Sequence, residues 1–104
     1  MRLKTRTPEV LDQIIHERAR LSILSALAAA EELSFPEVQG ITGLTDGNLS
    51  VQLRTLEAAG YVALRKSEAG GRSARTAVRL TQAGRRAFRG YLEALRRIIG
   101  KVRP

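Results

Sequence analysis

Apolar residues recur along this chain at two different spacings, and the spacing changes at residue 61. Up to residue 60 they fall three or four positions apart, which is typical of helices that cover a core with one face. Between residues 61 and 80 they alternate with polar residues, which is typical of strands. From residue 81 the helical spacing returns and continues to Val102. The pattern therefore predicts several helices, a β-hairpin and one last long helix.

The first 33 residues are predicted to hold a basic arm and N-terminal helices. The arm is residues 1–7, with the sequence MRLKTRT, and the helices lie within residues 8–33, the first of them over 8–15. A polar segment around Glu17 interrupts the helical spacing, so we expect one helix to end or bend there and another to begin. The apolar positions on either side of it are Val10, Leu11, Ile14, Ile15, Leu21, Ile23, Leu24 and Leu27.

A short helix followed by a tight turn is predicted next. Ser34 and Glu37 have the spacing of a capping box, in which each side chain accepts from the backbone N–H of the other residue. The helix should run from there toward Gly43, with Val38 and Ile41 facing the core. The turn should begin at Gly43.

A second helix should begin directly after this turn. Thr45 is a good N-cap, and Asp46 in the first turn suits the helix dipole. Gly60 is expected to close the helix, which makes residues 34–60 a helix, a turn and a helix. The buried stripe of this second helix consists of Leu49, Leu53 and Leu56.

Residues 61–80 predict a β-hairpin, and residues 81–104 predict a long helix. Strands are expected at 61–66 and 75–80, on either side of a Gly-rich turn. Thr81 is the expected N-cap of a helix about 33 Å long. The apolar positions of this helix are Phe88, Tyr91, Leu92, Leu95, Ile98, Ile99 and Val102.

The charge of the chain is concentrated in its second half. The net charge is +8, with 18 Lys and Arg against 10 Asp and Glu. The first 60 residues hold six basic and eight acidic residues, whereas residues 61–104 hold twelve basic and two acidic residues. So uneven a distribution of positive charge suits binding to a polyanion, and nucleic acid is the leading candidate. The alternative is that the charge serves only to keep the protein soluble.

Composition narrows the classes of function further. The chain has no cysteine, which removes disulfides, thiolate nucleophiles and cysteine-ligated zinc. It has a single histidine, His16, and no Gly-rich phosphate loop, so we expect no catalysis, no metal and no other cofactor. The longest apolar stretch is too short for a membrane span, which needs roughly 20 residues. The expectation is one 104-residue domain in the cytoplasm, associated with the nucleoid and not with a membrane.

Several motifs occur in order from the predicted turn onward. The segment GLTDGNLS over 43–50 is followed by Leu53 and by LEAAGYV over 56–62. The predicted hairpin then contains GRSART over 71–76, and Thr81 with Gly84 opens the last helix. Together these motifs resemble the short winged helix-turn-helix domains of MarR/ArsR-type regulators, over most of the chain.

The resemblance implies a mostly α-helical fold with a small β-hairpin, the wing, and long terminal helices. It also implies that the helix after the turn lies in the major groove of DNA, with the wing along the neighbouring backbone or minor groove. Val51 and Gln52 depart from the family, because such domains often have Arg and His at these two positions.

The outward face of the helix after the turn is the expected DNA-reading surface. Asn48 and Gln52 suit adenine, and Val51 suits a thymine methyl group. Hydroxyl groups and Arg54 suit phosphate oxygens, and the basic residues of the wing should neutralise phosphates or enter the minor groove. The alternatives are plain helix capping and a hairpin with solvated charges. The expected DNA-binding residues are Thr45, Gly47, Asn48, Ser50, Val51, Gln52, Arg54, Thr55, Lys66, Arg72 and Arg75.

The last helix has more apolar surface than a three-helix core would cover. Pairing with a second copy, together with the helix expected at 8–15, would bury that surface. The alternative is that the helix folds back on its own domain. The expected interface residues are Leu11, Ile14, Ile15, Phe88, Leu92, Leu95, Ile99 and Val102.

These features predict a sequence-specific transcription regulator that binds double-stranded DNA as a homodimer. One alternative is a winged-helix module that docks an acidic protein, although such a module has no need for a basic hairpin beside a polar helix face. Another is a non-specific nucleic-acid-binding protein, which would show little preference among DNA sequences.

Overall fold

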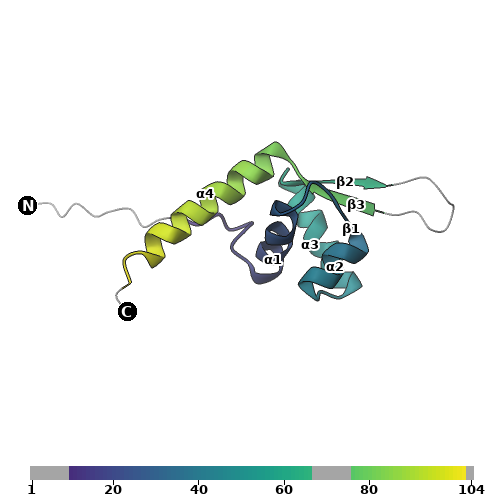
Figure 1. Cartoon of the computed structure of the whole chain (residues 1–104), viewed down its shortest axis with the longest axis horizontal. Coiled ribbons are helices and arrows are strands. Elements are labelled where there is room, and N and C mark those ends of the chain that lie inside the picture. Colours follow the sequence, from purple (N-terminus) through teal and green to yellow (C-terminus); the bar gives the residue numbers. More distant parts are fainter. Residues whose placement is uncertain (1–9, 67–75, 103–104) are drawn as a thin grey trace, which may run out of the picture.

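Four helices and three short strands make up the computed structural model, which describes residues 10–66 and 76–102 (Figure 1). Three of the helices gather beneath the hairpin, and the hairpin and the last helix extend to opposite sides of this body. The predicted fold class, mostly α with a small β-hairpin, is confirmed. The elements in chain order are α1 (Arg18–Ala28), β1 (Leu33–Ser34), α2 (Phe35–Thr42), α3 (Asp46–Ala58), β2 (Val62–Lys66), β3 (Thr76–Leu80) and α4 (Gln82–Ile99).

Local sequence accounts for the start of α2, α3 and α4. The Ser34 hydroxyl accepts from Glu37 N at 3.1 Å, and the Glu37 carboxylate accepts from Ser34 N at 2.8 Å, which completes the capping box. The hydroxyl groups of Thr45 and Thr81 each accept from the backbone N–H three residues further on, at 3.2 and 2.9 Å. All three predicted caps are confirmed.

Two glycines end α2 and α3 in the left-handed conformation. Gly43 has φ 74° and Gly60 has φ 82°, and other residues adopt such values only with strain. Gly43 leads the chain into the three-residue connection before α3, and Gly60 leads it into the hairpin. The turn and the helix end predicted at these glycines are confirmed.

The hairpin belongs to a three-stranded antiparallel sheet in the order β1–β3–β2. Val78 of β3 lies opposite Leu64 of β2 on one side and Leu33 of β1 on the other. Val78, Val62 and Leu80 are buried, which fixes the face of the sheet that packs on the helices. Strand β1 has only two residues, too few for a pattern, and sequence analysis missed it.

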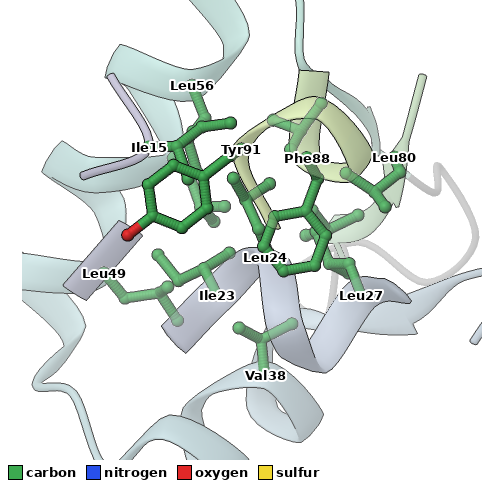
Figure 2. Packing of buried hydrophobic residues seen from close by; sticks show 13 residues of the cluster. Ile15, Ile23, Leu24, Leu27, Val38, Leu49, Leu56, Leu80, Phe88 and Tyr91 are labelled. Carbon is green, nitrogen blue, oxygen red and sulfur yellow. The ribbon is translucent and has the colours of Figure 1, made fainter. Parts of the chain in front are cut away.

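The core joins the helices to one face of the sheet, and α4 covers part of it. Figure 2 shows Phe88 and Tyr91 of α4 lying over the body near Ile15, Ile23 and Leu24. The predicted leucine stripe of α3 is confirmed as fully buried. Its members are Leu49, Leu53 and Leu56.

The helix expected over residues 8–15 is not formed in the part that the structure describes. Residues 13–15 form a single turn instead, because the Asp12 carboxylate accepts from the backbone N–H of Ile14 at 2.8 Å and of Ile15 at 3.3 Å. A side chain bonded in this way replaces the hydrogen bonds of a continuing helix. The boundary predicted around Glu17 is confirmed, because the Glu17 carboxylate accepts from Arg20 N and caps α1.

Two further expectations about helices are wrong. Ile41 is 61% exposed and stands outside the core, because it lies in the last turn of α2, which ends at Thr42. Helix α4 ends at Ile99, and its 18 residues span about 27 Å, so Val102 lies beyond it.

Candidate nucleic-acid interface

The buried stripe of α3 leaves a polar face of the same helix turned to solvent. Asn48, Val51 and Arg54 are exposed on this face, and Gln52 is half-buried at its edge. The remaining expected residues also lie along this helix or at its start. Thr45 and Gly47 are exposed, and Ser50 and Thr55 are half-buried.

The first turn of α3 is tied to α2. Gln39 donates through Nε2 to Asp46 Oδ1 at 2.5 Å, and Asp46 also lies where a carboxylate suits the helix dipole. This carboxylate is therefore occupied in positioning the two helices of the helix-turn-helix. The Thr45 hydroxyl caps the helix and is exposed, so its proton remains free to donate to a phosphate.

An arginine of α1 reaches the polar face of α3, which sequence analysis missed. Arg20 donates through Nη1 to Gln52 Oε1 at 2.7 Å, and Gln52 donates through Nε2 to Asn48 Oδ1 at 3.0 Å. The Arg20 Nε also donates to the backbone oxygen of Ile14 at 2.6 Å. Arg20 and Gln52 are 32 residues apart, and no local pattern signals a contact over that separation.

A groove of about 600 Å³ separates α3 from the hairpin. Arg54 of α3 and Lys66 of β2 bring positive charge to it, and Glu57 is the acidic residue in its lining. The groove therefore runs beside the polar face of α3, with one basic residue on each side. Its full lining is Phe35, Ser50, Leu53, Arg54, Glu57, Leu64, Lys66 and Thr76.

Successive basic residues of β2 turn to opposite faces of the sheet. Lys66 shares the face of Leu64 toward α3, whereas Arg65 lies on the other face and binds Glu32 at 2.8 Å. This hydrogen bond, and then the charge of Glu32, raise the pKa of Arg65. Sequence analysis expected the basic residues of the wing as a group to meet phosphates, but the guanidinium of Arg65 is already paired with Glu32. Arg72 and Arg75 lie outside the described residues.

The residues expected at an interface between copies fall into three groups. Ile15 and Phe88 are buried in the core of the single chain, so the expectation that they face a second copy is wrong. Leu11, Ile14 and Leu95 are half-buried and pack against the same core. Tertiary packing draws these five inward because α4 lies across the body at this end. The three that remain exposed are Leu92 at 43%, Ile99 at 57% and Val102 at 67%.

Two further features, a cluster of metal-binding side chains and a membrane-spanning helix, are absent from the described ranges. Residues 10–66 and 76–102 contain no group of three or more His, Cys, Asp or Glu side chains placed to hold a metal ion. Within the same ranges, no helix is both long and apolar enough to cross a bilayer.

The element order, the capped turn between α2 and α3, and the hairpin beside α3 define a winged helix-turn-helix. Residues 19–99 match the family described as the winged helix DNA-binding domain, and the chain belongs to this family. The family is not enzymatic, as the sequence predicts. DNA binding is the activity that the family implies.

The chain is similar to known proteins in sequence and in structure. The chain is 36% identical over 80 residues to the uncharacterised protein MJ0432 of Methanocaldococcus jannaschii, covering 77% of this chain and 86% of that protein. It resembles the structure of a transcriptional regulator homologue from Pyrococcus horikoshii OT3, with a TM-score of 0.79, 30% identity, and coverage of 86% and 87%.

A MarR-family regulator from Silicibacter pomeroyi has the same fold. Its TM-score is 0.64 and its identity 24%, and the match covers 88% of this chain and 63% of the other. The predicted resemblance to MarR-type winged helices is thus confirmed, and the domain is similar to transcriptional regulators.

Proposed function

We propose that the protein is a sequence-specific transcription regulator that binds double-stranded DNA as a homodimer. The observation that carries the proposal is the exposed polar face of α3, which lies beside a groove flanked by Arg54 and Lys66. A helix with amide side chains on its outer face has the donors and acceptors needed to contact base edges in a major groove.

The two kinds of contact divide between the two sides of the groove. Asn48 and Val51 on α3 are the candidates for base contacts. Gln52 supports Asn48 by donating a hydrogen bond to its side-chain oxygen. Arg54 and Lys66 are the candidates for phosphate contacts, which position the protein without reading sequence. Thr45, Gly47, Ser50 and Thr55, along the same helix, and the wing arginines Arg72 and Arg75 complete the proposed DNA-binding set.

The proposed dimer uses the far end of α4. This helix projects from the body in Figure 1. Its exposed apolar residues are Leu92, Ile98 and Ile99, which lie in the second half of its sequence. Val10 and Val102 are also exposed. Contact with a second copy would stabilise these exposed apolar side chains. Burial contributes about 25 cal/mol of stabilising free energy for each Å² of apolar surface removed from water.

Selection from a random-sequence DNA library tests both halves of the proposal. A homodimer with two-fold symmetry places two α3 helices in successive major grooves. The enriched sites should therefore be inverted repeats, with half-site centres about 10–10.5 base pairs apart or a multiple of that.

Two results would contradict the proposal. If no sequence were enriched over the starting library, the protein would not be sequence-specific and would be at most a non-specific DNA-binding protein. Enrichment of single, unpaired half-sites would keep specificity but remove the dimer.

A further inference from the structure

The guanidinium of Arg20 is held between the N-terminal segment and α3. Only 18% of the side chain is exposed. Its Nε donates to Ile14 O at 2.6 Å and its Nη1 to Gln52 Oε1 at 2.7 Å. Glu17 Oε1 lies 3.9 Å from the same Nη1 and adds a nearby negative charge. The guanidinium is thus fixed from both ends, and Gln52 meets a donor with a set position.

The chemistry of this donor fixes the orientation of two amides in turn. A guanidinium carries donors and no acceptor, so Gln52 has to turn its oxygen toward Arg20. The Gln52 nitrogen then faces Asn48, and it donates to Asn48 Oδ1 at 3.0 Å. The Asn48 oxygen is thereby turned toward Gln52 with one of its two lone pairs engaged, and no hydrogen bond within the described residues uses the Nδ2 hydrogens of Asn48. The exposed Asn48 side chain therefore offers two amide donors to the solvent side of α3.

Base edges differ in what they accept from such a group. A bidentate contact from one amide to adenine needs both the oxygen, for N6, and an N–H, for N7, turned toward the base. Guanine presents two acceptors in the major groove, N7 and O6. An asparagine whose oxygen is turned toward Gln52 and whose amino group is free matches guanine better than adenine.

We propose that Arg20 is a specificity-determining positioning residue, which acts through Gln52 to make Asn48 select guanine. The inference rests on the proposed function, because it refines the base preference of the same helix. Without Arg20, the Gln52 amide is free to rotate, and the Asn48 oxygen is free to turn toward the base. The preference should then broaden to include adenine.

The test measures the affinity of the full chain for duplexes that differ at one base pair. The position is identified as the one at which Asn48→Ala loses discrimination, and duplexes then carry guanine, 7-deazaguanine or adenine there. We expect the wild-type protein to bind the guanine duplex about tenfold more tightly than the adenine duplex. Loss of N7 in 7-deazaguanine should remove much of this preference.

Arg20→Met should reduce the guanine preference to less than about threefold. Arg18→Met is the matched control, because Arg18 is exposed on the same helix and the change in charge is identical. This control should keep the wild-type preference. Should Arg20→Met fail to fold, Gln52→Ala provides the same readout. This variant removes the donor that orients the Asn48 oxygen and leaves the Ile14 contact of Arg20 in place.

The outcomes separate this inference from the proposed function. Equal loss of affinity for the guanine and adenine duplexes in both variants would overturn the inference, because it is what a merely structural role produces. A wild-type preference for adenine at this position would overturn the inference alone. A wild-type protein with no preference among DNA sequences would overturn the proposed function itself.

Discussion

The hydroxyl group of Tyr61 donates a hydrogen bond to Oδ2 of Asp12, 49 residues earlier in the chain, at 2.5 Å. Tyr61 follows the glycine that ends α3, and Asp12 holds the turn that precedes α1. The bond thus joins the N-terminal segment to the junction between α3 and the hairpin. The hydrogen bond to the Asp12 carboxylate, together with burial and the negative charge, raises the pKa of Tyr61 to about 12.

Tyr61→Phe should lower the free energy of unfolding by about 1 kcal/mol at neutral pH, the usual value of one hydrogen bond. The pKa of the folded protein, about 12, exceeds the ordinary value of 10, so the folded chain keeps a proton that the unfolded chain releases. The stabilisation is therefore complete below pH 10 and disappears as the pH rises through 12. Denaturant unfolding of both proteins at pH 8 and pH 11 checks this. A difference between them that stays constant with pH would contradict it.

Gly84→Ala should destabilise the domain by about 1–3 kcal/mol or more. A Cβ at this position would lie 2.0 Å from the backbone oxygen of Tyr61, and neither backbone segment can move without disturbing the end of the sheet or the start of α4. Gly90→Ala is the control, because a Cβ there meets nothing within 4 Å in the same helix. That change should stabilise by about 0.5–1 kcal/mol. Thermal unfolding of the two variants should shift in opposite directions.

Lys66→Ala should reduce the salt dependence of DNA binding, whereas Arg65→Ala should change it less. Lys66 lines the groove beside α3, while Arg65 is paired with Glu32 on the other face of the hairpin. Loss of one phosphate contact lowers the slope of log K against log salt by about one unit. Arg72→Ala and Arg75→Ala should act like Lys66→Ala, weakening binding to all sequences alike. If the slope of log K against log salt were the same for Lys66→Ala and the wild type, Lys66 would not contact a phosphate.

Asn48→Ala should cost roughly 1–3 kcal/mol of binding free energy at the selected site and relax the preference at one base pair of each half-site. Non-specific binding should change little, because the variant keeps the basic residues of the groove. Affinities for the selected site and for random DNA measure the two effects. A uniform loss on both duplexes would mean that Asn48 only positions the protein on the backbone.

Ile99→Asp should dissociate the proposed dimer without unfolding the chain. Ile99 is 57% exposed near the end of α4, so an aspartate is tolerated there in a monomer but leaves a charge buried at a shared interface. Leu95→Asp is the contrasting variant, since Leu95 packs against the core and its substitution should destabilise the domain itself. Analytical ultracentrifugation at micromolar concentration, with circular dichroism alongside, distinguishes the two. A wild-type monomer would disprove the dimer.

Local signals in the sequence predicted most of the fold. The capping residues Ser34, Thr45 and Thr81, and the left-handed glycines Gly43 and Gly60, act within a few residues of their own position. The buried stripe of α3 follows from helical spacing alone. Such features need no knowledge of the rest of the chain, and they were sufficient to predict the helix-turn-helix, the hairpin and the exposed face of α3.

Only the tertiary structure decided which of the predicted side chains remain free. Ile15 and Phe88 enter the core because α4 and the N-terminal segment meet across the body. Arg65 of β2 binds Glu32, just before β1, across the strand β3 that lies between them. Arg20 meets Gln52 only because α1 packs beside α3. Each of these contacts joins residues more than 30 positions apart, where periodicity and capping rules carry no information. The sequence by itself therefore determined where the helices and strands lie and which face of α3 is exposed, whereas packing between distant elements determined which polar groups on that face are already bonded.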